Sequence, residues 1–359
     1  MAADDPNAHH RDMTGSSALQ ITWPSTLPPL SMLAADPVAD TDLTQIVAMY
    51  EACRQVLEFT GTPVIAQIQR THLQHGWDGE RPEVWVVRDD GVIVADLQIW
   101  TSTYENLDRA FLGLSVHPEH RGRGIGSALV EFGEARVRSM GRALTMAGTR
   151  ESQVADERFA DAHGYRKVMR GVLRRQVLAD LDRTAVAAAV AEAMPRAADY
   201  EFVHVRDRIP DDLIDGMVAV ESAINDAPRD EGTWDDEVPT VERLRAAEDG
   251  HRMRGLAIWT VIARRRSDGD VAGQTTVGVH PEAPEHGHQH LTAVRREHRG
   301  HRLGLLLKAD MLDWLAAEAP EVATIDTDNA GSNDHMIGIN ELLGYHVVGA
   351  FWEREKKLD

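Results

Sequence analysis

The chain has 359 residues, too many for one ordinary domain and about right for two, and its 43% hydrophobic and 27% charged residues exclude wholesale disorder. No apolar run approaches the ~20 residues that cross a bilayer, and the single cysteine, Cys53, excludes a disulfide framework and zinc sites that need paired thiolates. The 38 Lys and Arg residues against 58 Asp and Glu give a formal net charge of -20, so we expect a cytoplasmic protein with no membrane or nucleic-acid partner.

The first half of the chain predicts a hairpin, a third strand and a helix. Residues 1–18 carry few apolar side chains and are expected to be disordered. Strands are predicted over 83–88 and 92–100, on either side of an Asp-Asp-Gly turn, and another over 111–116. A glycine-rich segment follows, and the apolar residues of 125–140 then recur at helical spacing.

The glycine-rich segment occurs twice in the chain. The run RGRGIG that begins at Arg121 reappears in altered form as RGHRLG from Arg299, 178 positions later. The Gly-Tyr pair at Gly164 recurs at Gly344, 180 positions later. Two landmarks with nearly the same offset indicate that a whole domain was duplicated.

The second copy repeats the order of predicted elements. Strands are expected over 256–263, 271–279 and 290–294, and a helix follows from Leu303 until Pro320 closes it. We therefore predict four segments: a disordered N-terminus at 1–18, a first domain at 19–176, an alanine-rich linking helix with a connector at 177–199, and a second domain at 200–359.

A strand that runs into Arg-Gly-Arg-Gly-Ile-Gly and then into a helix is suited to hold phosphate. Glycine permits positive φ and a close approach to the backbone, and the first N–H groups of a helix are unpaired and lie at the positive end of its dipole. Arg121 and Arg123 add charged donors. A Rossmann fingerprint is excluded because Ser127 stands where its third glycine belongs, and a P-loop because the turn has no lysine. The turn fits a pyrophosphate.

The run VHPEHRGRGIG, followed by an amphipathic helix, a strand, a second helix and Gly-Tyr, resembles the coenzyme-A-binding core of the GNAT superfamily of N-acetyltransferases. The signature Arg/Gln-x-x-Gly-x-Gly/Ala is matched by Arg121, Gly124 and Gly126. Because the resemblance covers most of both halves, the whole chain is similar to the two-domain, mycothiol synthase-like tandem members. It implies an α/β (α+β) fold with two tandem GNAT domains, each a mixed, largely antiparallel sheet flanked by helices.

The resemblance further implies acetyl-CoA as the acetyl donor, bound in the splay between two strands with its pyrophosphate on the turn. The residues expected to bind coenzyme A are those of the strand before each turn, those of the turns and two asparagines: Leu114, Ser115, Val116, Arg121, Gly122, Arg123, Gly124, Ile125, Gly126, Thr292, Ala293, Val294, Arg299, Gly300, His301, Arg302, Leu303, Gly304, Asn329 and Asn333.

Acetyl transfer to an amine places two demands on the protein. An alkyl ammonium of pKa about 10.4 must lose its proton to a base before it attacks a thioester, whereas the departing thiol, of pKa ~8.5, needs an acid less. Many relatives place an acidic tyrosine four residues before the Gly-Tyr pair, and there this chain has Ala160 in the first half and Asn340 in the second. Neither half keeps the usual acid.

Candidate bases are the titratable residues near the two phosphate-leading strands. In the second half these are His290, with His288 and Glu285 near it, and in the first half Glu105 and Asp96. For each of them, a solvated hairpin or strand residue is the simpler interpretation. The catalytic candidates are thus His290, Asn340 and Glu105. The alternating histidines lack a carboxylate or cysteine framework at ligand spacing, so no metal is expected.

Two positions distinguish the halves. Arg302 replaces a signature glycine, which is harmless if its φ is helical and costs about 1 kcal/mol or more if its φ is positive. Asn333 is either a helix N-cap or, as in relatives, a hydrogen-bond partner of the coenzyme arm. The stretch 149–154 of the first half has no asparagine. We slightly prefer the C-terminal half as the catalytic one.

Acceptors in this fold bind beneath the first two helices of a domain, and in the second half that region is acidic. A cationic acceptor is drawn to such a segment, and Trp234 is placed to pack against an ammonium, although a solvated acidic loop is the simpler interpretation. The carboxylates are Asp226, Asp230, Glu231, Asp235, Asp236 and Glu237.

The sequence thus predicts an acetyl-CoA-dependent N-acetyltransferase, a monomer or homodimer, that moves an acetyl group to the amine of a small cationic acceptor by direct attack. One alternative is a non-catalytic acyl-CoA-binding or scaffold protein in which one or both domains are degenerate. The other is acetylation of a protein N-terminus or lysine.

Overall fold

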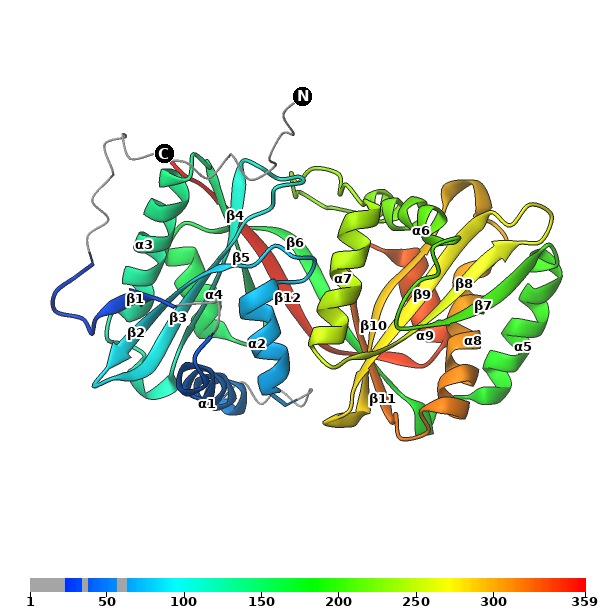
Figure 1. Cartoon of the computed structure of the whole chain (residues 1–359), viewed down its shortest axis with the longest axis horizontal. Helices are drawn as coiled ribbons and strands as arrows, with labels where there is room; N and C mark the ends of the chain where they lie inside the picture. The colour runs from blue at the N-terminus through cyan, green and yellow to red at the C-terminus, as the bar shows by residue number, and fades with distance from the viewer. Residues whose placement is uncertain (1–22, 34–37, 57–62) are drawn as a thin grey trace, which may run out of the picture.

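The computed structural model describes residues 23–33, 38–56 and 63–359, so the predicted disordered segment 1–18 lies outside the described residues. The strands of the described part form one continuous sheet of 12 strands, in the order β1-β2-β3-β4-β5-β12-β6-β11-β10-β9-β8-β7. The two halves of the chain lie side by side along this sheet, each with its own helices (Figure 1).

Each half contains the strand-turn-helix order that the repeat predicts. The elements of the first half are β1 (Leu30–Met32), α1 (Asp40–Val56), α2 (Ala66–His75), β2 (Glu83–Asp89), β3 (Val92–Trp100), β4 (Arg109–Val116), η1 (Pro118–His120), α3 (Ile125–Ser139), β5 (Leu144–Arg150), α4 (Val154–Ala162) and β6 (Arg166–Val177). Those of the connector are η2 (Leu178–Asp180), α5 (Arg183–Ala193) and η3 (Met194–Ala197). Those of the second half are β7 (Tyr200–Arg206), α6 (Ile214–Glu221), η4 (Ser222–Asp226), α7 (Val241–Met253), β8 (Ala257–Arg265), β9 (Val271–His280), β10 (Ala283–Val294), η5 (Arg296–His298), α8 (Leu303–Glu318), β11 (Thr324–Ala330), α9 (Asp334–Leu342) and β12 (Tyr345–Lys357).

The predicted hairpin of the first half is confirmed. Asp90 and Gly91 connect β2 to β3 with φ of 48° and 82°, the pair of positive angles that a two-residue turn needs to match the twist of its strands. The register pairs Asp89 with Val92 directly across this turn. The hairpin brings β3 against β4, the strand that enters the first glycine-rich turn.

The two halves exchange their last strands, which the sequence did not predict. β12 leaves the second half and pairs with β5 of the first along Phe351–Lys357 (Figure 1). β6 of the first half pairs with β11 of the second along its residues 171–177, and β6 and β12 pair with each other at the centre. The expected domain boundary after residue 176 falls at the end of β6. Because β6 pairs with β11, however, this strand completes the sheet of the second half.

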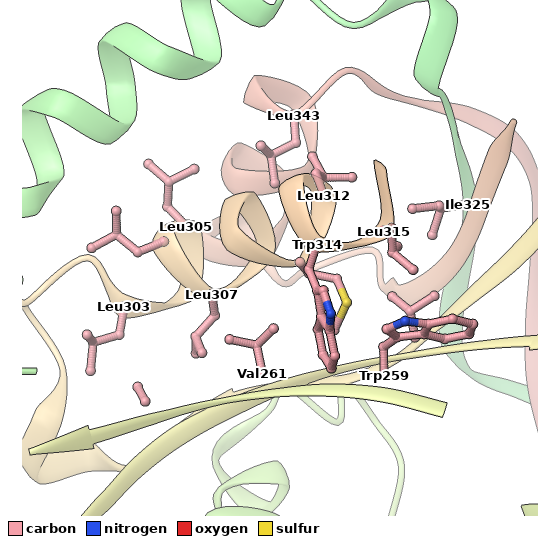
Figure 2. Close-up of a cluster of buried hydrophobic side chains, with 14 of the residues drawn as sticks. Trp259, Val261, Leu303, Leu305, Leu307, Leu312, Trp314, Leu315, Ile325 and Leu343 are labelled. Atoms are coloured by element: carbon pink, nitrogen blue, oxygen red, sulfur yellow. The ribbon is translucent and has the colours of Figure 1, made fainter. Parts of the chain in front are cut away.

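Helix α8 carries the core of the second half. Its leucines and Trp314 pack over Trp259 and Val261 of β8 (Figure 2). The predicted linking helix exists as α5, and it packs against the same cluster through Val186 and Val190. Within the described ranges, no helix is both long enough and apolar enough to cross a membrane.

Candidate functional site

Both glycine-rich turns connect a strand to a helix in the same way. β4 leads through η1 into α3, and β10 leads through η5 into α8. Gly122 and Gly300 occupy matching positions with φ of 73° and 87°, and a Cβ built on either residue meets no atom within 4 Å. Open space therefore lies over both turns, beside the unpaired amides of a helix start that bind phosphate.

Arg302 stands where the first half has Gly124, and both residues have left-handed backbone, with φ of 59° and 85°. The φ of Arg302 is therefore positive, which is the conformation that we expected to be strained for a non-glycine residue. A non-glycine residue in this conformation costs about 1–2 kcal/mol. The strain places an exposed guanidinium at the start of α8, where phosphate is expected.

In each half the strand before the turn separates from its parallel neighbour. β4 pairs with β5 only over Arg109–Phe111, and β10 pairs with β11 only over His286–His288. Beyond these points Leu114–Val116 and Thr292–Val294 stay paired to β3 and β9 on one side only. Both halves thus contain the V-shaped gap that the resemblance implies.

A pocket of about 500 Å³ opens at the gap of the second half. We call it the gap pocket; its walls include His288, Thr292, Lys308, Asn329, Asn333 and Trp234. A second pocket of about 290 Å³ lies between β8–β10 and helices α6 and α7, and we call it the helix pocket; its walls include Arg243, Glu248, His251, Thr260 and Thr276. Glu221, Glu237, His290 and Leu291 line both pockets, so the two spaces meet at these residues.

The two asparagines that were expected to bind coenzyme A both line the gap pocket, and they have different roles. Asn333 is the N-cap of α9, because its Oδ1 accepts a hydrogen bond of 3.2 Å from the backbone N–H of Met336. Asn329 donates from Nδ2 to the carbonyl of Ala330 at 2.7 Å, while its buried Oδ1 has no partner. An unpaired buried oxygen is costly, and a donor from a ligand in the pocket satisfies it.

Glu221, the last residue of α6, is a carboxylate that sequence analysis missed. It accepts a hydrogen bond from Nε2 of Gln274 on β9, and burial raises its pKa to about 7, with the nearby Glu237 adding to the effect. The carboxylate is therefore present in both protonation states near neutral pH, which suits a general base. The repeat carried an indirect signal. Gln274 lies 178 positions after Asp96, so the second half has an amide where the first half has a carboxylate, and its own carboxylate must come from another position.

His290 lies at the junction of the two pockets, as a candidate base should. Burial lowers its pKa well below the ordinary value, and the neighbouring His288, His251 and Arg254 lower it further. Its Nε2 is buried without a hydrogen-bond partner. The ring is thus neutral and a weak base, so Glu221 is better matched to removing a proton at pH 7.

Asn340 lies in the interior of the second half. It is 1% exposed and accepts a hydrogen bond of 2.7 Å from Nζ of Lys308. Lys308 itself lines the gap pocket, so Asn340 adjoins the site through this lysine. Sequence analysis did not single out Lys308, which lies among the buried leucines of α8.

The remaining base candidates lie elsewhere. Glu105 forms an ion pair of 2.9 Å with Arg243 of α7 and accepts from the amide of Val238, so it joins the two halves rather than facing a turn. Glu285 stands at the closed end of the second gap, where its carbonyl accepts from Ala323. Neither residue lines the gap pocket or the helix pocket. In the part of the chain that is described, no group of three or more His, Cys, Asp or Glu is arranged to hold a metal ion.

The acidic segment of the second half is largely engaged in ion pairs. Asp226 binds Arg296 and, at 2.6 Å, the signature arginine Arg299. Asp236 pairs with Arg229, and Asp230 accepts from Ser332. Glu237 differs, because it lines both pockets and burial raises its pKa.

The gap of the first half is covered by its own helix α1. Sγ of Cys53 lies 3.5 Å from the carbonyl of Val116 at the end of β4, and Nη2 of Arg121 lies 3.8 Å from the same sulfur. Asp96 is 1% exposed and accepts from the hydroxyl of Tyr50 at 2.5 Å, and burial raises its pKa to about 6. A carboxylate is present, but it is enclosed.

Comparison with known proteins agrees with this geometry. Residues 80–167 match the family model of the acetyltransferase (GNAT) domain, and no curated protein sequence matched the chain. Among solved structures, a tandem GNAT protein from the clavulanic acid biosynthesis pathway is 26% identical, with a TM-score of 0.76 over 92% of this chain and 98% of that one.

Two further structures share the fold at lower identity. A GCN5-related N-acetyltransferase from Sphaerobacter thermophilus is 18% identical, with a TM-score of 0.66 over 94% of this chain and 97% of that one. The glucosamine N-acetyltransferase region of a fungal multi-domain β-N-acetylglucosaminidase is 15% identical, with a TM-score of 0.65 over 91% of this chain and 38% of that one. Residues 80–167 thus form a GNAT acetyltransferase domain, and the chain has, over its length, the fold of a tandem GNAT protein.

Proposed function

We propose that the protein is an acetyl-CoA-dependent N-acetyltransferase whose catalytic site is in the C-terminal half and whose acceptor is a small cationic amine. The observation that carries the proposal is the meeting of the gap pocket and the helix pocket at Glu221, a carboxylate whose pKa burial raises to about 7. A donor on one side and an amine on the other would meet beside a base.

GNAT domains use acyl-CoA donors, and the second half fits one. The second half offers the free edge of Thr292–Val294 to the pantetheine arm, the unpaired Oδ1 of Asn329 to a donor group, and the turn from Arg299 to Gly304, open over Gly300, to the pyrophosphate. Bound acetyl-CoA would supply an acetyl group activated as a thioester. The protein would align the thioester and exclude water around it.

The helix pocket favours a cation. Its wall contains more carboxylates than cationic side chains, and its Arg243 is already committed to Asp78 and Glu105. An ammonium that enters meets Glu221 and Glu237, and Glu221 takes its proton so that the nitrogen can attack. The relative at 26% identity comes from the clavulanic acid biosynthesis pathway, which supports a small molecule as acceptor.

For the first half we propose a structural role. Its counterpart carboxylate, Asp96, is enclosed by Tyr50 and Gln98, and Cys53 lies against the end of β4. The alternative of a degenerate, non-catalytic domain then applies to the first half only.

Two matched substitutions test which half works. Gly126 and Gly304 open the two helices at equivalent positions, and a Cβ on either lies 3.3 Å from one side-chain carbon, of Phe159 or Ile339. Gly126→Glu and Gly304→Glu are thus equally crowded, and each puts a carboxylate where pyrophosphate is expected. We expect Gly304→Glu to abolish thiol release from acetyl-CoA over a panel of cationic amines and Gly126→Glu to retain it.

Acetyl-CoA titration calorimetry on both variants completes the test, with thermal melts to confirm folding. Retained turnover in Gly304→Glu would contradict the assignment to the second half. Coenzyme binding without thiol release on any amine would favour a binding protein over an enzyme.

A further inference from the structure

Three residues in the second half correspond to a purely apolar cluster in the first. Lys308 of α8, Asn340 of α9 and Tyr345 of β12 follow their counterparts by 178, 180 and 180 positions. In the first half the counterparts pack as a small buried hydrophobic cluster, Val130, Ala160 and Tyr165. Two of the three positions have thus become polar in the second half, and both have done so together.

The two polar side chains bind each other in the interior. Lys308 is 2% exposed and Asn340 1% exposed, and Nζ of Lys308 donates to Oδ1 of Asn340 at 2.7 Å. The ring of Tyr345 lies on the other side, with its centroid 4.5 Å from Nζ. None of the salt bridges found in the described residues includes Lys308. An ammonium buried without a counter-ion is costly, and burial alone lowers its pKa to about 7.

This lysine faces the space expected to hold the thioester. Lys308 lines the gap pocket together with Thr292 of the strand before the turn. Asn340, which holds it, occupies the position at which GNAT relatives carry an acidic tyrosine. The hydrogen bond to Asn340 uses one of the three ammonium protons, so two remain for a ligand.

We propose that Lys308, positioned by Asn340, is the proton donor to the sulfur of coenzyme A in the second half; the inference rests on the proposed function. Glu221 takes one proton from the acceptor's ammonium and passes it to water. As the neutral nitrogen bonds to the thioester carbonyl carbon, Glu221 takes a second proton from that nitrogen. As the carbon–sulfur bond breaks, the sulfur takes a proton from the Lys308 ammonium. The products are an amide and a thiol, and Glu221 and Lys308 recover their starting states through water.

Other titratable groups share the pocket with Lys308 and bear on any pH dependence. They are Glu221 from α6, Arg229, Asp235 and Glu237 from the segment after it, His288 and His290 from β10, and Asp328 from β11. Arg229 is paired with Asp236, and its guanidinium keeps its protons. Burial lowers the pKa of both histidines, so they are neutral. Near neutral pH the cationic proton donor among these groups is therefore Lys308.

The test measures the thiol pKa of bound coenzyme A and needs no acceptor. All proteins carry Gly126→Glu, so only the second half binds, and the ultraviolet absorbance of the thiolate is followed as the pH is raised. We compare the parent with the double variant Lys308→Val, Asn340→Ala, which carries the residues of the first half and therefore retains a packing that this chain already uses. An adjacent ammonium favours the thiolate, and the thiolate in turn holds the proton on Lys308, so the two groups titrate as a coupled pair. We therefore expect the thiolate to appear at a pH lower by about one unit or more in the parent.

Two single variants separate the roles within the cluster. Asn340→Asp keeps a hydrogen-bond acceptor for Lys308 but adds a negative charge that offsets the charge of the ammonium. The thiol pKa should therefore rise toward that of the double variant. Tyr345→Phe keeps the ring and removes the hydroxyl, so the thiol pKa should not change. A rise in Tyr345→Phe with no rise in the double variant would assign the acid to the tyrosine and overturn the proposal.

The remaining outcomes are distinct. If coenzyme A binds the parent and its thiol pKa is the same in the double variant, the role of Lys308 is refuted and the proposed function stands. If coenzyme A does not bind the Gly126→Glu parent, both proposals fail.

Discussion

Glu221 is the last residue of helix α6, and burial is the main cause of its raised pKa. Replacing it by glutamine keeps an oxygen that accepts from Gln274 but removes the base. We expect Glu221→Gln to lower kcat by about 10²–10⁴-fold and to remove the rise of kcat through pH 7, measured with the best amine of the panel. Glu237→Gln is the control: it removes a charge from the same pockets and should raise KM for the acceptor more than it lowers kcat. Equal losses of kcat in both variants would show that the negative charge of these residues, and not proton transfer, supports the reaction.

The same substitution makes a prediction about stability that needs no ligand. The pKa of Glu221 is about 7 in the folded protein, against an ordinary value of 4.5. Between these values the unfolded chain loses its proton first, so this group makes stability fall as pH rises from 4.5 to 7, and the full cost persists above 7. Glu221→Gln should therefore be more stable than the parent at pH 8 by on the order of 3 kcal/mol, with the difference vanishing toward pH 4.5. Urea unfolding at both pH values measures it.

Arg302 and Gly124 offer a reciprocal pair for the strain in the turns. Arg302→Gly relieves a left-handed side chain but loosens the unfolded chain, for a net gain of about 0.5–1 kcal/mol in unfolding free energy. Gly124→Arg, the reverse change, should lose about 0.5–1 kcal/mol. Denaturant unfolding of both variants checks the pair, and a loss of stability in Arg302→Gly would mean that its guanidinium makes compensating contacts.

At these positions sequence analysis identified the turns but not the base or the buried lysine. Glycine spacing is local, so Gly122 and Gly300 are visible in the sequence. Glu221 becomes a base only because the fold buries it beside Gln274, 53 positions away. Lys308 looks like an ordinary helical lysine until the structure shows the apolar residues around it.

At the scale of elements, β12 is attached to the first half through a buried arginine. Arg354 is 0% exposed; its guanidinium lies 2.7 Å from Asp161 and 2.9 Å from Glu157, and it donates to the carbonyl of Tyr165. Arg354→Leu removes the buried ion pairs with Asp161 and Glu157 and the hydrogen bond to the carbonyl of Tyr165, although Glu157 keeps its ion pair with Lys167, and should cost about 1–3 kcal/mol of unfolding free energy. The exposed neighbour Lys357 is the control, since Lys357→Leu should change stability by less than about 0.5 kcal/mol. A similar small effect in both variants would mean that β12 is held by its backbone pairing alone.

The repeat explains why some elements were predictable and others were not. β2, β3 and α3 follow from local turn signals and periodicity, and their copies in the second half follow from the offset. β6 and β12 carry many charged residues, which argue against central strands. Those charges are paired across the chain, as Arg175 is with Asp326 and Lys356 with Glu134, and such distant partners leave no local pattern.

At the scale of the whole chain, the exchange of strands makes each half incomplete by itself. A fragment of residues 1–182 lacks β12, the partner of β5, and a fragment of residues 183–359 lacks β6, the partner of β11. Each would expose long strand edges, which favour aggregation. We expect neither fragment alone to unfold cooperatively and the two to co-purify when made together, as judged by size-exclusion chromatography and thermal melts. A soluble, cooperatively melting fragment 1–182 would contradict the prediction.

The placement of β12 also bears on biosynthesis. This strand is the last of the sheet to be made, yet it sits between β5 and β6 of the half that is made first. Until β12 has been synthesised, β5 and β6 of the early half lack the strand that lies between them, so this half cannot finish folding ahead of the rest. Translation must therefore pass the codons for β12 before the early half can close, and a stop placed ahead of them damages a segment encoded far upstream.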